Sequence, residues 1–125
     1  MNVRLALPLA FYGVLVTGCS SMRAVPTPML VQRDLPGAWD SGRSKMQIFC
    51  SGAFSFERPD VGNIVDYNRN QSGSVINELR DDAFVVGPIT KSVYKVQRWP
   101  ARNGDAVQMT VDDDVYTRTH DYDCQ

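Results

Sequence analysis

Residues that enzymes and metal sites depend on are scarce in this sequence. His120 is the only histidine, and cysteine occurs only at Cys19, Cys50 and Cys124. Serine–histidine catalysis would need a serine in a strained turn, but the sequence has no Gly-x-Ser-x-Gly motif. With one histidine, and with Cys19 assigned to a different role below, no Cys/His ligand set is available for a metal. Phosphate-binding loops, nucleotide-binding fingerprints and Cys-x-x-Cys redox motifs are also missing. We therefore predict no enzyme activity, no metal and no cofactor, and we expect His120 to be exposed.

An excess of basic residues is missing as well. Lys and Arg number 13 against 14 Asp and Glu, so the net charge is −1. A chain without a positive field does not gather nucleic acid or anionic lipid headgroups, and we predict that nucleic acid is not a partner. The acidic runs Asp81-Asp82 and Asp112-Asp113-Asp114 are typical of solvated turns, because a calcium loop needs spaced oxygen ligands.

The most informative stretch of the sequence is its N-terminus. The basic Arg4 precedes an uncharged apolar run, Leu5–Val16, and the small residues Thr17 and Gly18 stand directly before Cys19. This is the pattern of a secretory signal, and it is too short for a lasting membrane span. Thr17-Gly18-Cys19 resembles the lipobox of bacterial lipoproteins, which implies cleavage before Cys19 and lipidation of that cysteine. The alternative is an ordinary signal peptide with an incidental cysteine.

The same resemblance implies a location. Ser20, not Asp, follows Cys19, as in enterobacterial lipoproteins that are sorted to the outer membrane. We expect the protein on the periplasmic side of the outer membrane, with the inner membrane as the alternative. Three acyl chains exceed the two signals that stable attachment requires. The predicted organisation is a cleaved signal peptide at 1–18, a lipidated N-terminus and flexible linker at 19–34, and a globular domain at 35–125.

The predicted linker carries Pro26 and Pro28 and no periodic pattern, which favours an extended spacer. Its Met29–Val31 stretch could still dock on the domain as an edge strand. Two cysteines, Cys50 and Cys124, remain after Cys19 is assigned to lipid, and an even pair in an exported protein predicts one disulfide. The alternative is two free thiols or a metal site, and one histidine is too few for a Cys/His ligand set.

Short segments with alternating apolar and polar residues fill the rest of the chain, separated by turn residues. No run of ten or more residues has the apolar spacing and caps of a helix. These patterns predict strands at Lys45–Cys50, Ala53–Arg58, Val75–Leu79, Ala83–Val86, Ser92–Trp99, Ala106–Val111 and Val115–His120, and a weaker one at Ile64–Tyr67. Pro100 is expected to end its strand. The predicted fold is all-β, a small antiparallel meander barrel or sandwich of about 7–8 short strands with one disulfide.

Two short pieces of the sequence suggest a topology. Gly37-Ala38-Trp39 opens the domain, and Arg118 lies in the last predicted strand. This combination resembles lipocalin-like barrels, which start with Gly-x-Trp, and the resemblance implies that Arg118 covers Trp39. The domain is shorter than a typical lipocalin, so the resemblance bears on topology and not on ligand.

Three classes of function compete. A non-catalytic protein-binding module fits best, either an immunity or inhibitor lipoprotein or an accessory of an envelope machine; the alternative is a lipocalin-like barrel that binds a small apolar ligand, and an enzyme comes third. Trp and Arg are typical of contact hot spots, so we predict partner contacts at Tyr94, Arg98, Trp99 and Arg102. The alternative for Trp99 is that it caps the barrel. We expect the partner, an envelope protein, on loops facing away from the membrane or on an unpaired strand edge.

Overall fold

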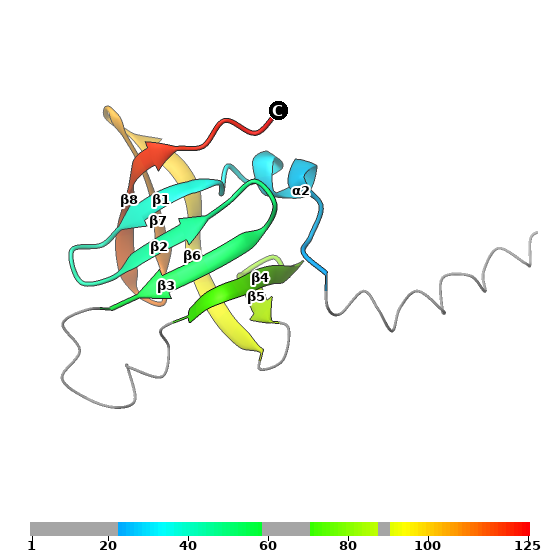
Figure 1. The fold of residues 1–125 in the computed structure, drawn as a ribbon. Helices are drawn as coiled ribbons and strands as arrows, with labels where there is room; N and C mark the ends of the chain where they lie inside the picture. Colours follow the sequence, from blue (N-terminus) through cyan, green and yellow to red (C-terminus); the bar gives the residue numbers. More distant parts are fainter. Residues whose placement is uncertain (1–22, 59–70, 88–90) are drawn as a thin grey trace, which may run out of the picture.

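The computed structural model describes residues 23–58, 71–87 and 91–125 as a closed barrel of eight antiparallel strands with a short helix at one end (Figure 1). The helix is α2 (Thr27–Gln32), and the strands are β1 (Gly37–Asp40), β2 (Lys45–Ile48), β3 (Ala53–Glu57), β4 (Gln71–Leu79), β5 (Ala83–Gly87), β6 (Ser92–Asn103), β7 (Ala106–Val111) and β8 (Asp114–Asp121). Strands pair in chain order, and β8 returns to β1. The all-β prediction is confirmed, and the fold is a barrel rather than a sandwich. Within these ranges no helix is long and apolar enough to cross a bilayer.

Alternation along the strands sorts side chains between the interior and solvent. Met46 and Ile48 of β2 and Phe54 and Phe56 of β3 are buried, whereas their neighbours along each strand are more exposed. The register pairs Met46 with Phe56 and Ile48 with Phe54, so the two inward faces meet. This agrees with the predicted alternation in both segments. The predicted strand at Ile64–Tyr67 lies outside the described residues.

Aromatic rings fill the middle of the barrel. Tyr94 stacks on Phe84 with ring centroids 5.2 Å apart and packs at a tilt against Phe54 at 5.1 Å. Met109 and Ile76 are fully buried in the same cluster. An eight-stranded barrel can hold a small ligand or be filled by side chains. Here the buried rings and aliphatic side chains pack on one another as one core cluster.

The helix α2 closes one end of the barrel, which we call the helix end (Figure 1). Leu30 is fully buried there, and the Val25 backbone N–H donates to the Ile76 carbonyl at 2.8 Å. Pro26 is extended as predicted, but the flexible, extended linker is wrong for residues 27–32, which form α2, and so is an edge strand at Met29–Val31. The prediction took Pro28 as a linker residue. In the structure Pro28 lies in the first turn of α2, where a proline is favourable because the N–H that it lacks would have no partner within the helix.

The disulfide links two segments at the helix end. Cys50 and Cys124 are bonded with their Cα atoms 5.5 Å apart, which confirms the prediction. The bridge ties the C-terminal segment to the turn between β2 and β3. The hydroxyl of Thr27 donates to the Cys50 carbonyl at 2.6 Å, so the start of α2 is attached to the same turn.

Arg118 joins the helix end to the first strand, in an arrangement we call the Arg118 clasp. Its guanidinium lies 5.2 Å from the centre of the Trp39 ring, and its Nη1 donates to the Asp34 Oδ1 at 2.9 Å. The Trp39 indole N–H donates to the Leu35 carbonyl at 3.0 Å. A Cβ on Gly37 would lie 2.5 Å from the Arg118 Cδ, so only glycine leaves room for the arginine to reach Trp39. The predicted contact between Arg118 and Trp39 is thus present.

The long strand β6 continues past the proline that was expected to end it. Pro100 lies inside β6, within the second of two register shifts against β7. The first shift is between Val96 and Arg98, and the second is between Arg98 and Ala101. Proline cannot donate to a ladder, but irregular pairing removes the need for its N–H. The prediction that Pro100 ends the strand is therefore wrong, and β6 runs on to the turn at Gly104.

Candidate binding surface

The structure separates the four residues predicted to contact a partner. Tyr94 is 1% exposed and lies in the aromatic core, so its assignment to a contact surface is wrong. The sequence carried the signal for this, because alternation in β6 places Tyr94 and Val96 inward and their neighbours outward. Arg98 and Arg102 are exposed on β6.

Trp99 is held against the helix end. Its indole N–H donates to the Asp81 carbonyl at 2.9 Å, and the Arg33 guanidinium lies 4.4 Å from the centre of its ring. Arg33 also donates from Nη1 to the Arg80 carbonyl at 2.9 Å. The ring packs on the edge of the core while remaining partly exposed. Through these contacts Trp99 connects β6 to the C-terminal end of α2 and to the β4–β5 turn.

The opposite end of the barrel, which we call the far end, is held by a polar cluster. Arg58 donates from Nε to the Ser44 hydroxyl at 2.8 Å and from Nη2 to the Asp114 Oδ2 at 3.0 Å. Ser44 is 1% exposed, and the side chains of Arg58 and Asp114 are 17% and 18% exposed. Arg43 reaches Asp114 at 3.8 Å from the solvent side. Asp114 therefore does not belong to a solvated turn as predicted, because it is the partner of a largely covered arginine.

Tyr116 lies beneath this cluster. It is 2% exposed, and burial raises the pKa of its phenol, while a hydrogen bond with Ser44 lowers that pKa in part. At the hairpin tip Asp112 accepts a hydrogen bond from the Lys95 backbone N–H at 3.1 Å. Asp113 is exposed, as predicted for a turn, and so is His120 at the other end of β8.

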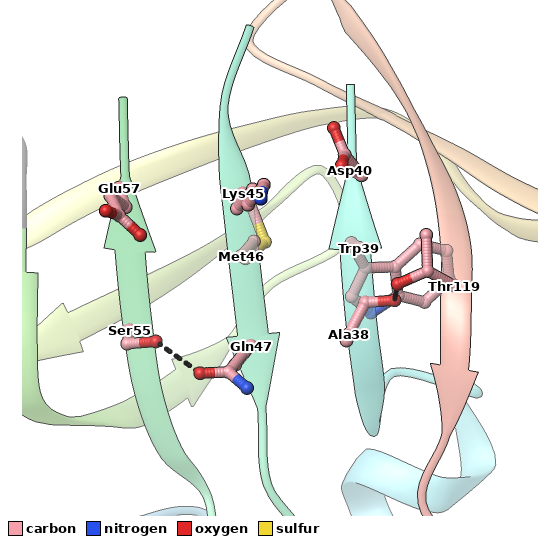
Figure 2. Close-up of a pocket in the computed structure, with 9 residues that line it drawn as sticks. All are labelled: Ala38, Trp39, Asp40, Lys45, Met46, Gln47, Ser55, Glu57 and Thr119. Carbon is pink, nitrogen blue, oxygen red and sulfur yellow. Dashed lines mark hydrogen bonds between the residues drawn. The ribbon is translucent and has the colours of Figure 1, made fainter. Parts of the chain in front are cut away.

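A groove runs along the outside of the barrel over β1, β2 and β3, and we call it the β1–β3 groove (Figure 2). Its volume is about 290 Å³, and it is lined by Ala38, Trp39, Asp40, Lys45, Met46, Gln47, Ser55, Glu57 and Thr119. The strand register places Lys45 beside both Asp40 and Glu57, and Figure 2 shows these three side chains at one level. This row adjoins the turn that carries Arg43 and Ser44, so the groove opens onto the far-end cluster.

The groove offers hydrogen-bonding groups on a rigid support. Ser55 donates to the Gln47 Oε1 at 3.3 Å, and the Gln47 Nε2 donates to the Tyr122 hydroxyl at 3.1 Å. Lys45, an exposed donor, stands between two acidic side chains in the adjacent row. A surface that alternates donors and acceptors suits polar contacts with a protein, where complementary charge sets specificity and orientation.

Sequence reasoning missed this groove although part of its signal was present. Alternation in the second and third strands assigns Lys45, Gln47, Ser55 and Glu57 to outward faces. The sequence does not show the strand register that aligns those faces with Asp40. Arg58 and Asp114 are 56 residues apart in the sequence, so no local pattern predicts their ion pair.

Two smaller hollows lie at the helix end. One of about 260 Å³ is lined by Val31, Asp34, Pro36, Asp121, Tyr122, Asp123 and Cys124. Another of about 270 Å³ is lined by Arg102, Asp105, Ala106, Val107, Arg118, Thr119, His120 and Asp121. Among the described residues no three His, Cys, Asp or Glu side chains are grouped so that they could hold a metal ion.

No protein-family model matches this chain, and neither a curated protein nor a solved structure is significantly similar to it. The groove and the far-end cluster are therefore interpreted from their own chemistry.

Proposed function

We propose that this protein is a lipid-anchored lipoprotein of the bacterial envelope that binds another envelope protein without catalysis. The observation that carries the proposal is the packed barrel: Phe54, Phe84 and Tyr94 occupy the space where a lipocalin-like barrel would hold a ligand. Binding must then use the outer surface. This favours the protein-binding module over the alternative of a small apolar ligand inside the barrel.

The β1–β3 groove and the adjacent far-end cluster supply the partner surface in this proposal. The partner surface predicted from sequence around Trp99 lies at the helix end, where Trp99 makes structural contacts with Arg33 and Asp81. The groove lies along the side of the barrel and extends to the far end, so it stays accessible on an anchored protein. Its row of Asp40, Lys45 and Glu57 fits a partner that presents charges of both signs. An immunity or inhibitor protein and an accessory of an envelope machine both work by such contact.

The anchor is tested by fractionating cells that express the wild type or Cys19→Ser. The wild type should enter the detergent phase and carry the added mass of acyl chains, and the variant should lose both properties. A variant that partitions into detergent as the wild type does would contradict the lipid anchor.

The partner surface is tested by photo-crosslinking in the native host, with a photoreactive residue at Lys45 or at Arg102. Lys45 is an exposed basic residue in the groove, and Arg102 is an exposed basic residue on β6 outside it. The position in the groove should yield a discrete crosslinked protein, and the matched control should not. Equal crosslinking at both positions, or none at Lys45, would contradict this assignment.

A further inference from the structure

The N-terminal segment limits how far the barrel can lie from a lipid on Cys19. Val25 is 8% exposed and bonded to β4 through the Ile76 carbonyl. Ala24 packs closely on Gly52 of the β2–β3 turn. A Cβ on Gly52, which has a φ of +94°, would lie 2.6 Å from the Ala24 Cβ. Six residues from Cys19 to Val25 can span at most about 20 Å. A lipid on Cys19 therefore keeps the barrel close to the bilayer.

The end of the barrel beside this segment exposes apolar side chains. Met29 and Val31 of α2 are 42% and 47% exposed, and Phe49 of the β2–β3 turn is 37% exposed. Tyr122 stacks on Phe49 with ring centroids 5.4 Å apart, and it lines the same hollow as Val31. We call Val31, Phe49 and Tyr122 the apolar cap. They lie together because α2 and the C-terminal segment are both fixed to Cys50.

Folding of the barrel does not account for the apolar cap. In α2, Leu30 is the residue that enters the core, whereas Met29 and Val31 on either side of it stay largely in water. Scattered exposed apolar residues are ordinary on protein surfaces, but a contiguous group marks a contact with another apolar phase. The short tether brings one such phase within reach.

We propose that the apolar cap rests in the headgroup region of the bilayer that holds the Cys19 lipid, with the helix end facing the membrane. This inference rests on the proposed lipid anchor. Tyrosine and phenylalanine suit this depth, because one part of the interface is apolar and the other is wet. Asp121 and Asp123 line the hollow beside the cap. Their charge disfavours anionic headgroups, so the cap selects a zwitterionic surface and its contact depends little on salt.

The test uses two matched reporter variants of the lipid-anchored protein in zwitterionic vesicles, Val31→Trp and Val115→Trp. Both valines are exposed, at 47% and 52%, and Val115 is near the far end in β8. Tryptophan emission is measured before and after brominated lipids, which quench fluorophores in the bilayer, replace part of the phospholipid. The emission of the wild type, with its two tryptophans, is subtracted from each.

The added emission of Val31→Trp should fall at least about twofold, and that of Val115→Trp should be unchanged, because only the helix end meets the lipid. The quenching of Val31→Trp should weaken when half of the lipid is anionic. Equal emission changes in both variants on a protein that floats with the vesicles would overturn the docking surface and leave the anchor standing. A wild type that does not float with the vesicles would contradict the anchor, and the docking surface with it.

Discussion

The two ends of the barrel are closed by different chemistry. At the helix end the closure combines the Cys50–Cys124 bridge and the buried Leu30 with the Arg118 clasp, which includes an ion pair with Asp34. At the far end it is polar, through the Arg58–Asp114 ion pair. The mainly apolar closure leaves apolar side chains exposed around the helix end. The polar closure leaves hydrogen-bond donors and acceptors around the far end. Each margin carries the chemistry of what it is proposed to meet, a bilayer on one side and a protein on the other.

The largest effect is expected at the helix end, from removal of the disulfide. Its sequence separation is 74 residues, and closing a loop of that length stabilises the folded state by about 4 kcal/mol. Cys50→Ser/Cys124→Ser should lose that amount of free energy of unfolding in urea denaturation. Reductant should destabilise the wild type and leave the double variant unchanged. A double variant as stable as the oxidised wild type would contradict this account of the helix end.

The second-largest loss of stability is expected for Trp99→Ala. Truncation removes the packing of the ring on the core, its bond to the Asp81 carbonyl and its contact with Arg33, so we expect a loss of about 3 kcal/mol. Arg98→Ala, one residue earlier and exposed, is the matched control and should change stability by less than about 0.5 kcal/mol. Thermal melts of both variants decide the matter. An unchanged melting temperature for Trp99→Ala would return Trp99 to the candidates for partner contact.

Substitutions of two arginines at the far end compare the stability that a largely buried ion pair and an exposed one contribute. Arg58→Ala leaves Asp114 with its main partner removed in a largely covered site, so we expect a loss of about 2 kcal/mol. The side chain of Arg43 is 61% exposed, and Arg43→Ala should cost less than about 0.5 kcal/mol. Urea denaturation measures both. Equal losses in the two variants would show that burial is not what makes the Arg58 pair matter.

The smallest effect is a pH dependence at Tyr116. Burial raises the pKa of its phenol in the folded state, so the protein should keep this contribution below the ordinary tyrosine pKa of about 10. The contribution is then lost as the pH rises from there through the folded pKa, because the unfolded chain ionises first. In Tyr116→Phe the alkaline fall of stability should be shallower than in the wild type. An identical alkaline slope would contradict the assignment.

Local pattern was enough to predict most strands, although β4 begins earlier than predicted, at Gln71, and β6 runs past Pro100. The alternation of Lys45–Ile48 and Ala53–Glu57 defines their inward faces, because neighbouring residues decide which face is apolar. The contact between Trp39 and Arg118 was expected from the resemblance to lipocalin-like barrels, not from local pattern. The disulfide was predictable for a simpler reason, since only two cysteines were left to pair.

Long-range geometry was beyond the sequence. Pro28 is compatible both with a linker and with the first turn of a helix. The helix is favoured by tertiary packing, because it buries Leu30 against the end of the barrel. The groove needed the register of three strands. Strict alternation from Tyr94 and Val96 would assign Arg98 to the inward face, but Arg98 is exposed after the register shift between Val96 and Arg98.

Amide hydrogen exchange tests the division between the two ends most directly. The wild type anchored in zwitterionic vesicles is compared with soluble Cys19→Ser under identical conditions. The account predicts slower exchange on vesicles in 27–33, 49–51 and 122–124 at the helix end, and unchanged exchange in 41–44 and 112–114 at the far end. Slower exchange at the far end, or no difference at the helix end of a protein that is bound to the vesicles, would contradict it.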